Sequence, residues 1–120
     1  FFDGNLLTLQ IAASESLEMV AKAVRRLTCE PAEFFGVDAG RLDVGAQADS
    51  VLVDPEALRQ YDTDANRRMI YRDIFEHEQL VNRSDGVVAA VFIAGEQVWD
   101  GTDFTPALGS KRLGRALRAG

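Results

Sequence analysis

Apolar residues recur every three or four positions from Leu17 to Leu27, which predicts an amphipathic helix. Charged residues fill the opposite side of this segment, as expected for a helix that buries one face. Ser16 is the expected N-cap, because its hydroxyl can accept a hydrogen bond from a free amide of the first turn. Pro31 ends this helix and opens a second short one, which Gly36 closes in a left-handed conformation. Residues 1–13 show no such signal, and their local structure stays open.

After Gly40 the pattern changes to short β segments separated by turn residues. Alternating residues over 41–45 and a β-branched run over 49–54 predict two strands. Residues 55–61 are expected to form one helical turn. The charged stretch that follows, 62–80, has widely spaced apolar residues, so we expect it to hold at most short helical turns.

The apolar run over 87–93 is the best strand candidate in the chain. Ala94-Gly95-Glu96 offers a tight turn into 97–99, so the two segments predict a β-hairpin. Beyond Pro106 the chain is rich in glycine and basic residues, and we expect a tail along the surface. Together the elements indicate a mixed α and β fold, with N-terminal helices followed by short strands.

Length, charge and cysteine content narrow the range of functions. The 120 residues have the size of one ordinary domain, so the chain is one compact unit or part of one. Its 19 acidic against 13 basic residues give a net charge of -6, which argues against a nucleic-acid partner. The longest apolar run is far short of the roughly 20 residues that span a bilayer, so no membrane partner is expected. The single cysteine, Cys29, cannot form an internal disulfide, which fits a cytoplasmic location. A start at Phe1, with no initiator methionine and no leader pattern, favours a fragment of a larger protein.

Three residues carry candidate chemistry. His77 lies between two glutamates, and the favoured interpretation is a solvated surface residue rather than an acid, a base or a metal ligand. Cys29 at a helix end is interpreted as a small buried hydrophobe rather than a nucleophile. Asp3 precedes Gly4 in the way that many barrel hydrolases present a general base. Asp3 is the only catalytic candidate, and a loop aspartate is the favoured interpretation of it.

Two further motifs have ordinary explanations. The basic stretch 111–118 suits an anion or an acidic partner, and it equally fits a tail that crosses an acidic surface of the same molecule. The triplet Asn82-Arg83-Ser84 matches the N-glycosylation pattern, which is common by chance and matters only in a secretory pathway. The residues taken alone predict no cofactor-binding and no metal-binding site.

Three segments, in this order, resemble the closing part of enzymes of the amidohydrolase superfamily. Residues 16–37 resemble the last helix of that superfamily's barrel. Residues 40–54 resemble the return of its chain into a β-sandwich, with a glycine, a short strand, a second glycine, Ala-Asp and an apolar run. Residues 87–101 resemble its closing hairpin, which ends in Asp-Gly. The insertion over 59–84 and the ending over 113–118 look most like N-acyl-D-amino-acid deacylases (D-aminoacylases).

The resemblance implies a division of the chain and a supporting role for it. Residues 1–38 would be the last helical segment of the barrel, and 39–120 would belong to a composite C-terminal β-sandwich with a loop excursion at 59–84. The partners would be the upstream barrel and the N-terminal strands of the same enzyme. That parent would be a zinc-dependent hydrolase of linear amides, in particular N-acyl-D-amino acids, whereas this chain would bind no zinc. Asp49 is expected to anchor a turn by accepting backbone amides.

Two other interpretations stay open. One is a free-standing, non-catalytic β-rich binding or assembly module, and the other is a subunit of a split hydrolase. The reading frame upstream of Phe1 distinguishes the module from the fragment, because further barrel strands and a His-x-His motif support the enzyme and a nearby start codon supports the module. Co-purification with a barrel subunit would reveal the split hydrolase. A homo-oligomer is compatible with each of them.

Overall fold

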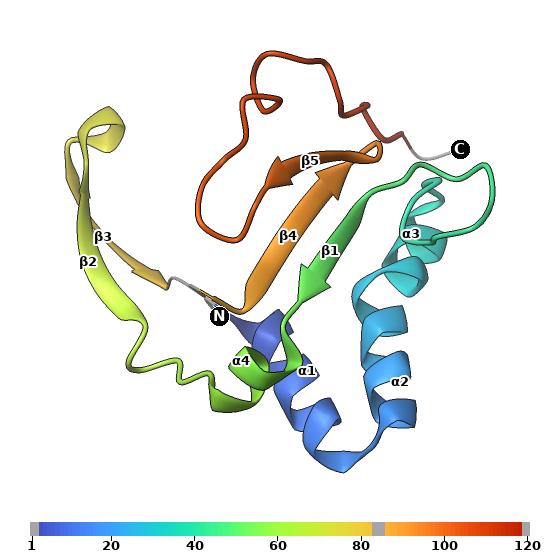
Figure 1. Ribbon diagram of the computed structural model, residues 1–120, viewed down its shortest axis with the longest axis horizontal. Coiled ribbons are helices and arrows are strands. Elements are labelled where there is room, and N and C mark those ends of the chain that lie inside the picture. Colours follow the sequence, from blue (N-terminus) through green and yellow to red (C-terminus); the bar gives the residue numbers. More distant parts are fainter. Residues whose placement is uncertain (1–2, 83–85, 119–120) are drawn as a thin grey trace.

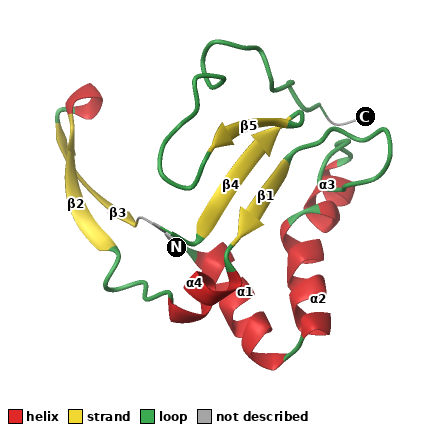
Figure 2. Ribbon diagram, in the orientation of Figure 1, coloured by secondary structure: helices red, strands yellow, loops and turns green. Residues whose placement is uncertain are grey.

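The chain forms helices first and small antiparallel sheets afterwards, as the sequence predicts (Figure 1). The computed structural model describes residues 3–82 and 86–118. Helices α1 (Gly4–Glu15), α2 (Leu17–Leu27) and α3 (Cys29–Phe35) follow one another, and Figure 2 shows α2 between α1 and α3, against both of which it packs. The mixed α and β fold class is therefore confirmed.

The predicted helix pair is present, and its ends have the expected chemistry. The Oγ of Ser16 accepts a hydrogen bond from the backbone amide of Met19 at 3.2 Å, so Ser16 is the N-cap of α2. Gly36 ends α3 with a φ of 64°, the left-handed conformation that glycine adopts without strain. Helix α3 begins at Cys29 rather than at Pro31. Proline is tolerated in this first turn because amides there have no intrahelical partner.

The sequence pattern of residues 1–13 does not predict helix α1. Asp3 occupies its N-cap position, but the Asp3 side chain makes no capping hydrogen bond. Ala12 is its one buried residue, so it has no broad apolar face of the kind that predicts a helix. Its packing against α2 and α4 stabilises it instead. None of the described helices is long and apolar enough to cross a membrane.

The central sheet has the antiparallel strand order β1–β4–β5. Its strands are β1 (Ser50–Val53), β4 (Val88–Ile93) and β5 (Glu96–Trp99), close to the predicted positions. Ala94 and Gly95 join β4 to β5 with φ values of 52° and 79°, because a tight hairpin turn needs two left-handed residues. The strand predicted over 49–54 and the hairpin predicted over 87–99 are both confirmed.

The prediction of a strand over 41–45 is wrong. This segment is a loop with turns, in which the Ala46 amide donates to the Asp43 carbonyl at 3.0 Å. Arg41 forms ion pairs with the carboxylates of Asp38 and Asp43, at 2.5 and 3.6 Å, which close the loop on itself. A strand also needs a partner, and within residues 3–82 and 86–118 this segment pairs with none. Leu42, one of its alternating apolar residues, is 76% exposed.

The prediction that the charged stretch 62–80 is a loop excursion with at most short helical turns is also wrong. It contains a second antiparallel sheet, the β2–β3 hairpin, made of β2 (Arg67–Arg72) and β3 (His77–Asn82). The 3-10 turn between the strands ends at Glu76, which adopts a left-handed φ of 53°. Glycine or asparagine usually marks such a position, so this turn carries no sequence signal.

The core lies where α4 (Pro55–Gln60) meets α1. Tyr61 and Val87 are buried there with Leu58, and Val87 is 2% exposed. Partly buried apolar side chains pack against them, namely Leu6, Leu9, Val53 and Ala57. Residues from the N-terminal helix and from the sheet therefore share one core.

Helix α4, predicted as a single helical turn, is held at both ends. The Oδ1 of Asp54 accepts hydrogen bonds from two amides of the first turn at 2.8 and 2.9 Å, which makes Asp54 the N-cap. At the other end, the side-chain amide of Gln10 donates to the carbonyl oxygens of Leu58 and Tyr61 at 3.0 and 2.9 Å. Helix α1 thus supplies a donor for the Tyr61 carbonyl just beyond α4 and a second donor for the Leu58 carbonyl, which also accepts from the Tyr61 amide.

Candidate functional site

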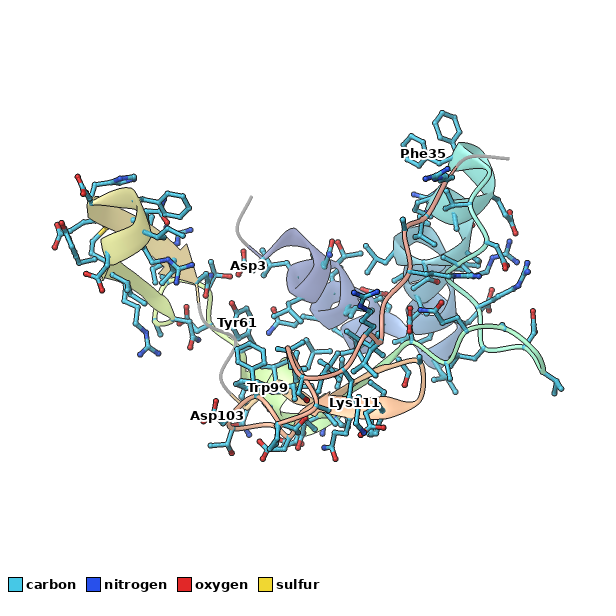
Figure 3. All side chains as sticks on the ribbon, turned by 90° about the horizontal axis from the view of Figure 1, so that it is seen from above. Asp3, Phe35, Tyr61, Trp99, Asp103 and Lys111 are labelled. Atoms are coloured by element: carbon cyan, nitrogen blue, oxygen red, sulfur yellow. The ribbon has the colours of Figure 1, made fainter. Side chains whose placement is uncertain are left out.

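Four polar side chains meet between the start of α1 and the base of the β2–β3 hairpin, and we call them the Asp3 cluster: Asp3, Tyr61, Thr63 and Asn82. The Oδ2 of Asp3 accepts hydrogen bonds from the Thr63 hydroxyl and from the Asn82 side-chain amide, the latter at 3.2 Å. The Tyr61 hydroxyl donates to the Oδ1 of Asn82 at 2.8 Å. Figure 3 shows Asp3 and Tyr61 near each other, on the side of α1 that faces the hairpin. The cluster is the one place where the structure gathers other side chains around the predicted catalytic candidate.

Each member of the Asp3 cluster is placed by a different element. Asp3 directly precedes α1, Tyr61 is the C-cap of α4, and Asn82 is the last residue of β3. Thr63 lies in the link to β2, where the Asp62 carboxylate accepts from the amides of the next turn at 2.8 and 3.2 Å. The cluster therefore connects the helical N-terminus of the chain to both ends of the hairpin.

The Tyr61 hydroxyl is a protonated hydrogen-bond donor to Asn82. Tyr61 is 8% exposed, and this burial raises the pKa of its phenol, with a further rise from the nearby Asp3 carboxylate. The bond to Asn82 acts in the opposite direction and is a smaller effect. The phenol is protonated at neutral pH even at its ordinary pKa of 10.0, and the upward shift extends this to more alkaline pH, so the Tyr61 hydroxyl can orient the Asn82 side chain.

The Asp3 cluster alone does not form a metal centre. Zinc sites normally draw three or four ligands from histidine, cysteine and carboxylates. The cluster contains one carboxylate, and the described residues hold no group of three or more such side chains. What the cluster can do is orient one carboxylate with a hydroxyl and an amide, and bind together two parts of the chain.

Neither of the other two candidate residues takes part in the Asp3 cluster as far as residues 3–82 and 86–118 show. His77 is exposed, as predicted, and its Nδ1 lies 2.8 Å from the carbonyl oxygen of Phe75. Cys29 is half-buried rather than fully buried, and its Sγ lies 3.8 Å from the Arg25 carbonyl oxygen. The helix junction at Cys29 leaves its side chain partly open, which explains the difference.

Asp49 anchors a turn, as the sequence predicts. Its Oδ1 accepts from the Ala94 amide in the β4–β5 turn at 2.8 Å, and Gln47 donates to its Oδ2 at 2.8 Å. The Ala94 amide lowers the pKa of the Asp49 carboxyl, and the Gln47 bond lowers it further. Asp49 thus ties the loop before β1 to the far end of the sheet.

The basic tail follows an acidic surface of the same molecule. Lys111 forms an ion pair with Glu96 at 2.7 Å, and Arg115 forms one with Asp38 at 3.2 Å. This arrangement confirms the second of the two interpretations of the stretch 111–118.

The sequence alone missed Tyr61, Thr63 and Asn82 as members of a site. Asn82 stood out only through the N-glycosylation pattern, whose Arg83 and Ser84 lie outside the described residues. Its side-chain amide is already bonded on both sides, to Asp3 and to Tyr61. The only available signal was a polar residue directly after the apolar pair Leu80-Val81, which is too common to identify a site.

Comparisons with known proteins identify the family of the chain. The model of the amidohydrolase family matches residues 5–98. Uncharacterized proteins of Mycobacterium tuberculosis and Mycobacterium bovis are 34% identical to it over 113 residues, which is 90% of this chain and 18% of each relative. The chain therefore spans about a fifth of the length of these curated relatives, and no solved structure matches it. From helix α1 into strand β5, the chain belongs to the amidohydrolase family.

Proposed function

We propose that these residues form the closing segment of a longer, metal-dependent amidohydrolase that cleaves linear amides, with N-acyl-D-amino acids as the substrate class. The observation that carries the proposal is the family match, which runs through the helices, the central sheet and the β4–β5 turn in one continuous stretch. The length of the relatives, of which this chain spans 18%, supports a larger enzyme. The D-aminoacylase assignment rests on the resemblance of residues 59–84 and 113–118 to those deacylases, and a cytoplasmic location accompanies it.

In this enzyme residues 1–38 complete the barrel, and residues 39–120 complete a β-sandwich with strands from the N-terminus. Exposed apolar side chains support such a role. Leu17 on α2 and Phe34 on α3 are 84% and 83% exposed, and Val51 and Leu52 of β1 are more than half exposed. Apolar surface of this extent marks an interaction site in a soluble protein.

We propose that residues outside this chain hold the zinc ions of the enzyme. The donor set supports this view, because the described residues contain no group of three histidine, cysteine or carboxylate side chains. This chain therefore completes the barrel and the β-sandwich of the proposed enzyme, rather than binding the metal.

We assign to Asp3 a tethering role within this proposal. The Oδ2 of Asp3 is engaged by Thr63 and Asn82, and these bonds fix the start of α1 to the base of the hairpin. A general base usually contributes a factor of about 10² to 10⁴ in rate. The Asp3→Asn variant is expected to keep kcat within about tenfold of wild type, whereas a loss of about 10² or more identifies Asp3 as the general base.

The test uses the full-length protein produced from the complete native gene. We expect hydrolysis of N-acetyl-D-methionine in preference to the L-enantiomer, loss of activity after chelation, and recovery after addition of zinc. Asp73→Asn, which changes an exposed carboxylate on the hairpin, is the matched control for Asp3→Asn. A native chain that starts near Phe1 and lacks hydrolase activity supports the non-catalytic module instead, and activity that needs a separate barrel protein supports a split hydrolase.

A further inference from the structure

The last part of the chain runs back along the outer edge of β5. Residues 104–118, which we call the C-terminal strap, contain no helix or strand. In Figure 1 the strap follows the end of β5, turns back past the sheet and continues toward the side of the molecule where α3 lies. Within the sheet β5 pairs with β4 on one side, and the strap covers its other edge.

The beginning of the strap is bonded to β5 itself. The Thr105 amide donates to the Val98 carbonyl at 3.0 Å, and the Thr105 hydroxyl donates to the Gln97 carbonyl at 2.6 Å. The ring of Phe104 meets the ring of Trp99 edge-on, with 5.1 Å between the centroids. The strap therefore replaces a further strand at this edge, where backbone groups would otherwise have no partner.

Two ion pairs hold the rest of the strap. The Nζ of Lys111 lies 2.7 Å from the Oε1 of Glu96, the first residue of β5. The guanidinium group of Arg115 lies 3.2 Å from the Oδ2 of Asp38 and also donates to the Asp38 backbone carbonyl. Asp38 lies in the loop that follows α3. The far end of the strap therefore connects the sheet to the exit of the helical segment.

The strap buries little apolar surface. Ala107 is the one buried residue of 104–118, whereas Phe104, Leu108 and Leu117 are 64%, 44% and 52% exposed. Segments with few buried apolar contacts open locally at a lower free energy than the core of the same protein. We therefore expect the strap to open while the central sheet stays folded.

The two ion pairs make the closure of the strap sensitive to salt. Their four side chains are between 42% and 62% exposed, so ions of the solvent reach them. The Debye length falls from about 10 Å at roughly 0.1 M ionic strength to about 3 Å at roughly 1 M, and this weakens exposed pairs. An exposed ion pair changes an equilibrium constant by a factor of up to about 5.

We propose that the C-terminal strap opens and closes as one unit over the edge of β5, and that Lys111 and Arg115 hold it closed through Glu96 and Asp38. Opening uncovers the edge of β5 and releases the connection between the sheet and the loop after α3. The strap is built from residues of this chain alone, so its opening does not depend on the reaction proposed above.

Hydrogen exchange of the full-length protein, followed by mass spectrometry, measures the opening. Peptides that cover the strap are compared with peptides that cover β4. When the NaCl concentration rises from about 0.1 M to about 1 M, exchange in the strap is expected to become about three- to tenfold faster, because both ion pairs are screened. Exchange in β4 is expected to stay the same. An unchanged strap, or an equal acceleration of both regions, overturns the proposal.

Charge variants test the role of the Lys111–Glu96 pair. Lys111→Glu places two carboxylates together and is expected to speed up exchange in the strap by about fivefold or more at low salt. The charge exchange Glu96→Lys/Lys111→Glu is expected to restore the wild-type rate. The matched control, Lys22→Glu, breaks the exposed Lys22–Glu18 pair on α2 and is expected to leave the strap unchanged. Exchange that stays fast in the charge-exchange variant contradicts the role of this ion pair.

The variant Arg115→Gln tests whether the strap opens as one unit. The Thr105 amide is bonded to β5, ten positions before Arg115 in the sequence. If the strap opens as one unit, loss of the Arg115–Asp38 ion pair speeds up exchange at Thr105 by the same factor as at 112–118, about two- to fivefold. An acceleration confined to 112–118 shows separate openings and overturns the proposal. These outcomes are the same whether or not the full-length protein hydrolyses an amide.

Discussion

A methyl group added at Gly40 is expected to destabilise the junction between α2 and α3 severely. Gly40 has a φ of 76°, and an added Cβ would lie 2.6 Å from both the carbonyl carbon and the carbonyl oxygen of Thr28. It would also lie 2.9 Å from the Cys29 amide nitrogen. These neighbours are backbone atoms at a helix junction, so they cannot move aside as a flexible side chain would.

The magnitude of the Gly40→Ala effect has two parts. A left-handed conformation costs an L-residue about 1–2 kcal/mol. Forcing an extra methyl group into close packing typically costs a further ~1–3 kcal/mol. We therefore expect Gly40→Ala to lower the free energy of unfolding by about 2–5 kcal/mol in total.

Gly45 provides a matched control in the same loop. Its φ is 88°, so alanine meets the same conformational cost, but an added Cβ at Gly45 would meet no atom within 4 Å. Gly45→Ala is therefore expected to cost only the first part, about 1–2 kcal/mol. The difference between the two variants isolates the close approach of the loop to the helix junction.

The assay is urea-induced unfolding of the full-length protein, with the wild type and the two alanine variants measured side by side. Limited proteolysis within the urea series reports on the opening of this loop in particular. A larger loss for Gly40→Ala by about 1–3 kcal/mol supports the close approach. Equal losses for the two variants refute the reasoning, because the backbone around Thr28 would then yield at no cost.

Three further predictions concern the core, the Asp3 cluster and the sheet turn. Leu58→Ala is expected to lower the free energy of unfolding by about 2–5 kcal/mol in urea titrations, whereas Leu42→Ala at an exposed position changes it little; similar values would contradict the buried role of Leu58. Tyr61→Phe removes the hydroxyl that donates to Asn82 and is expected to cost about 1 kcal/mol, measured against Tyr71→Phe on the exposed hairpin. The pKa of Asp49 is lowered in the folded chain, so its carboxylate stabilises the fold above its ordinary pKa of 3.8, and this stabilisation is lost as the pH falls through the folded value. Asp49→Asn is expected to weaken this acid dependence in thermal unfolding. A wild-type dependence of the Tm on pH in the variant argues against this role of Asp49.

Elements with local chemical signals could be predicted from the sequence. Ser16 and Gly36 mark the ends of the helical stretch, and Ala94-Gly95 marks the turn of the β4–β5 hairpin. In each case the side chain or backbone property that fixes the structure belongs to a residue inside the element. Fold class followed from these signals.

Elements that depend on distant partners could not be predicted. Helix α1 gains its stability from α2 and α4, and the β2–β3 hairpin turns through Glu76 without a glycine. Residues 41–45 show the opposite error, because their alternation resembles a strand while no described strand pairs with them. Pattern alone does not reveal whether a partner is present.

The candidate site was the least predictable part. Asp3 was identified by its own type and by the glycine that follows it, whereas its partners Thr63 and Asn82 lie 60 and 79 positions away in the sequence. Their meeting depends on how α4 and the hairpin are placed relative to α1. A contact of this range becomes visible only once the chain is folded.

The Gln10 bond to the end of α4 has a consequence for the order of folding events. Helix α4 has six residues, and an isolated helix shorter than about 12 residues is marginal in water. The Gln10 side chain on α1, some 50 positions earlier, donates to the Leu58 carbonyl within α4 and to the Tyr61 carbonyl at its C-cap, so we expect the end of α4 to gain support once that long loop has closed. The hairpin follows α4 through the link 61–66, so the docking of α1 on α4 also sets where the hairpin leaves the core.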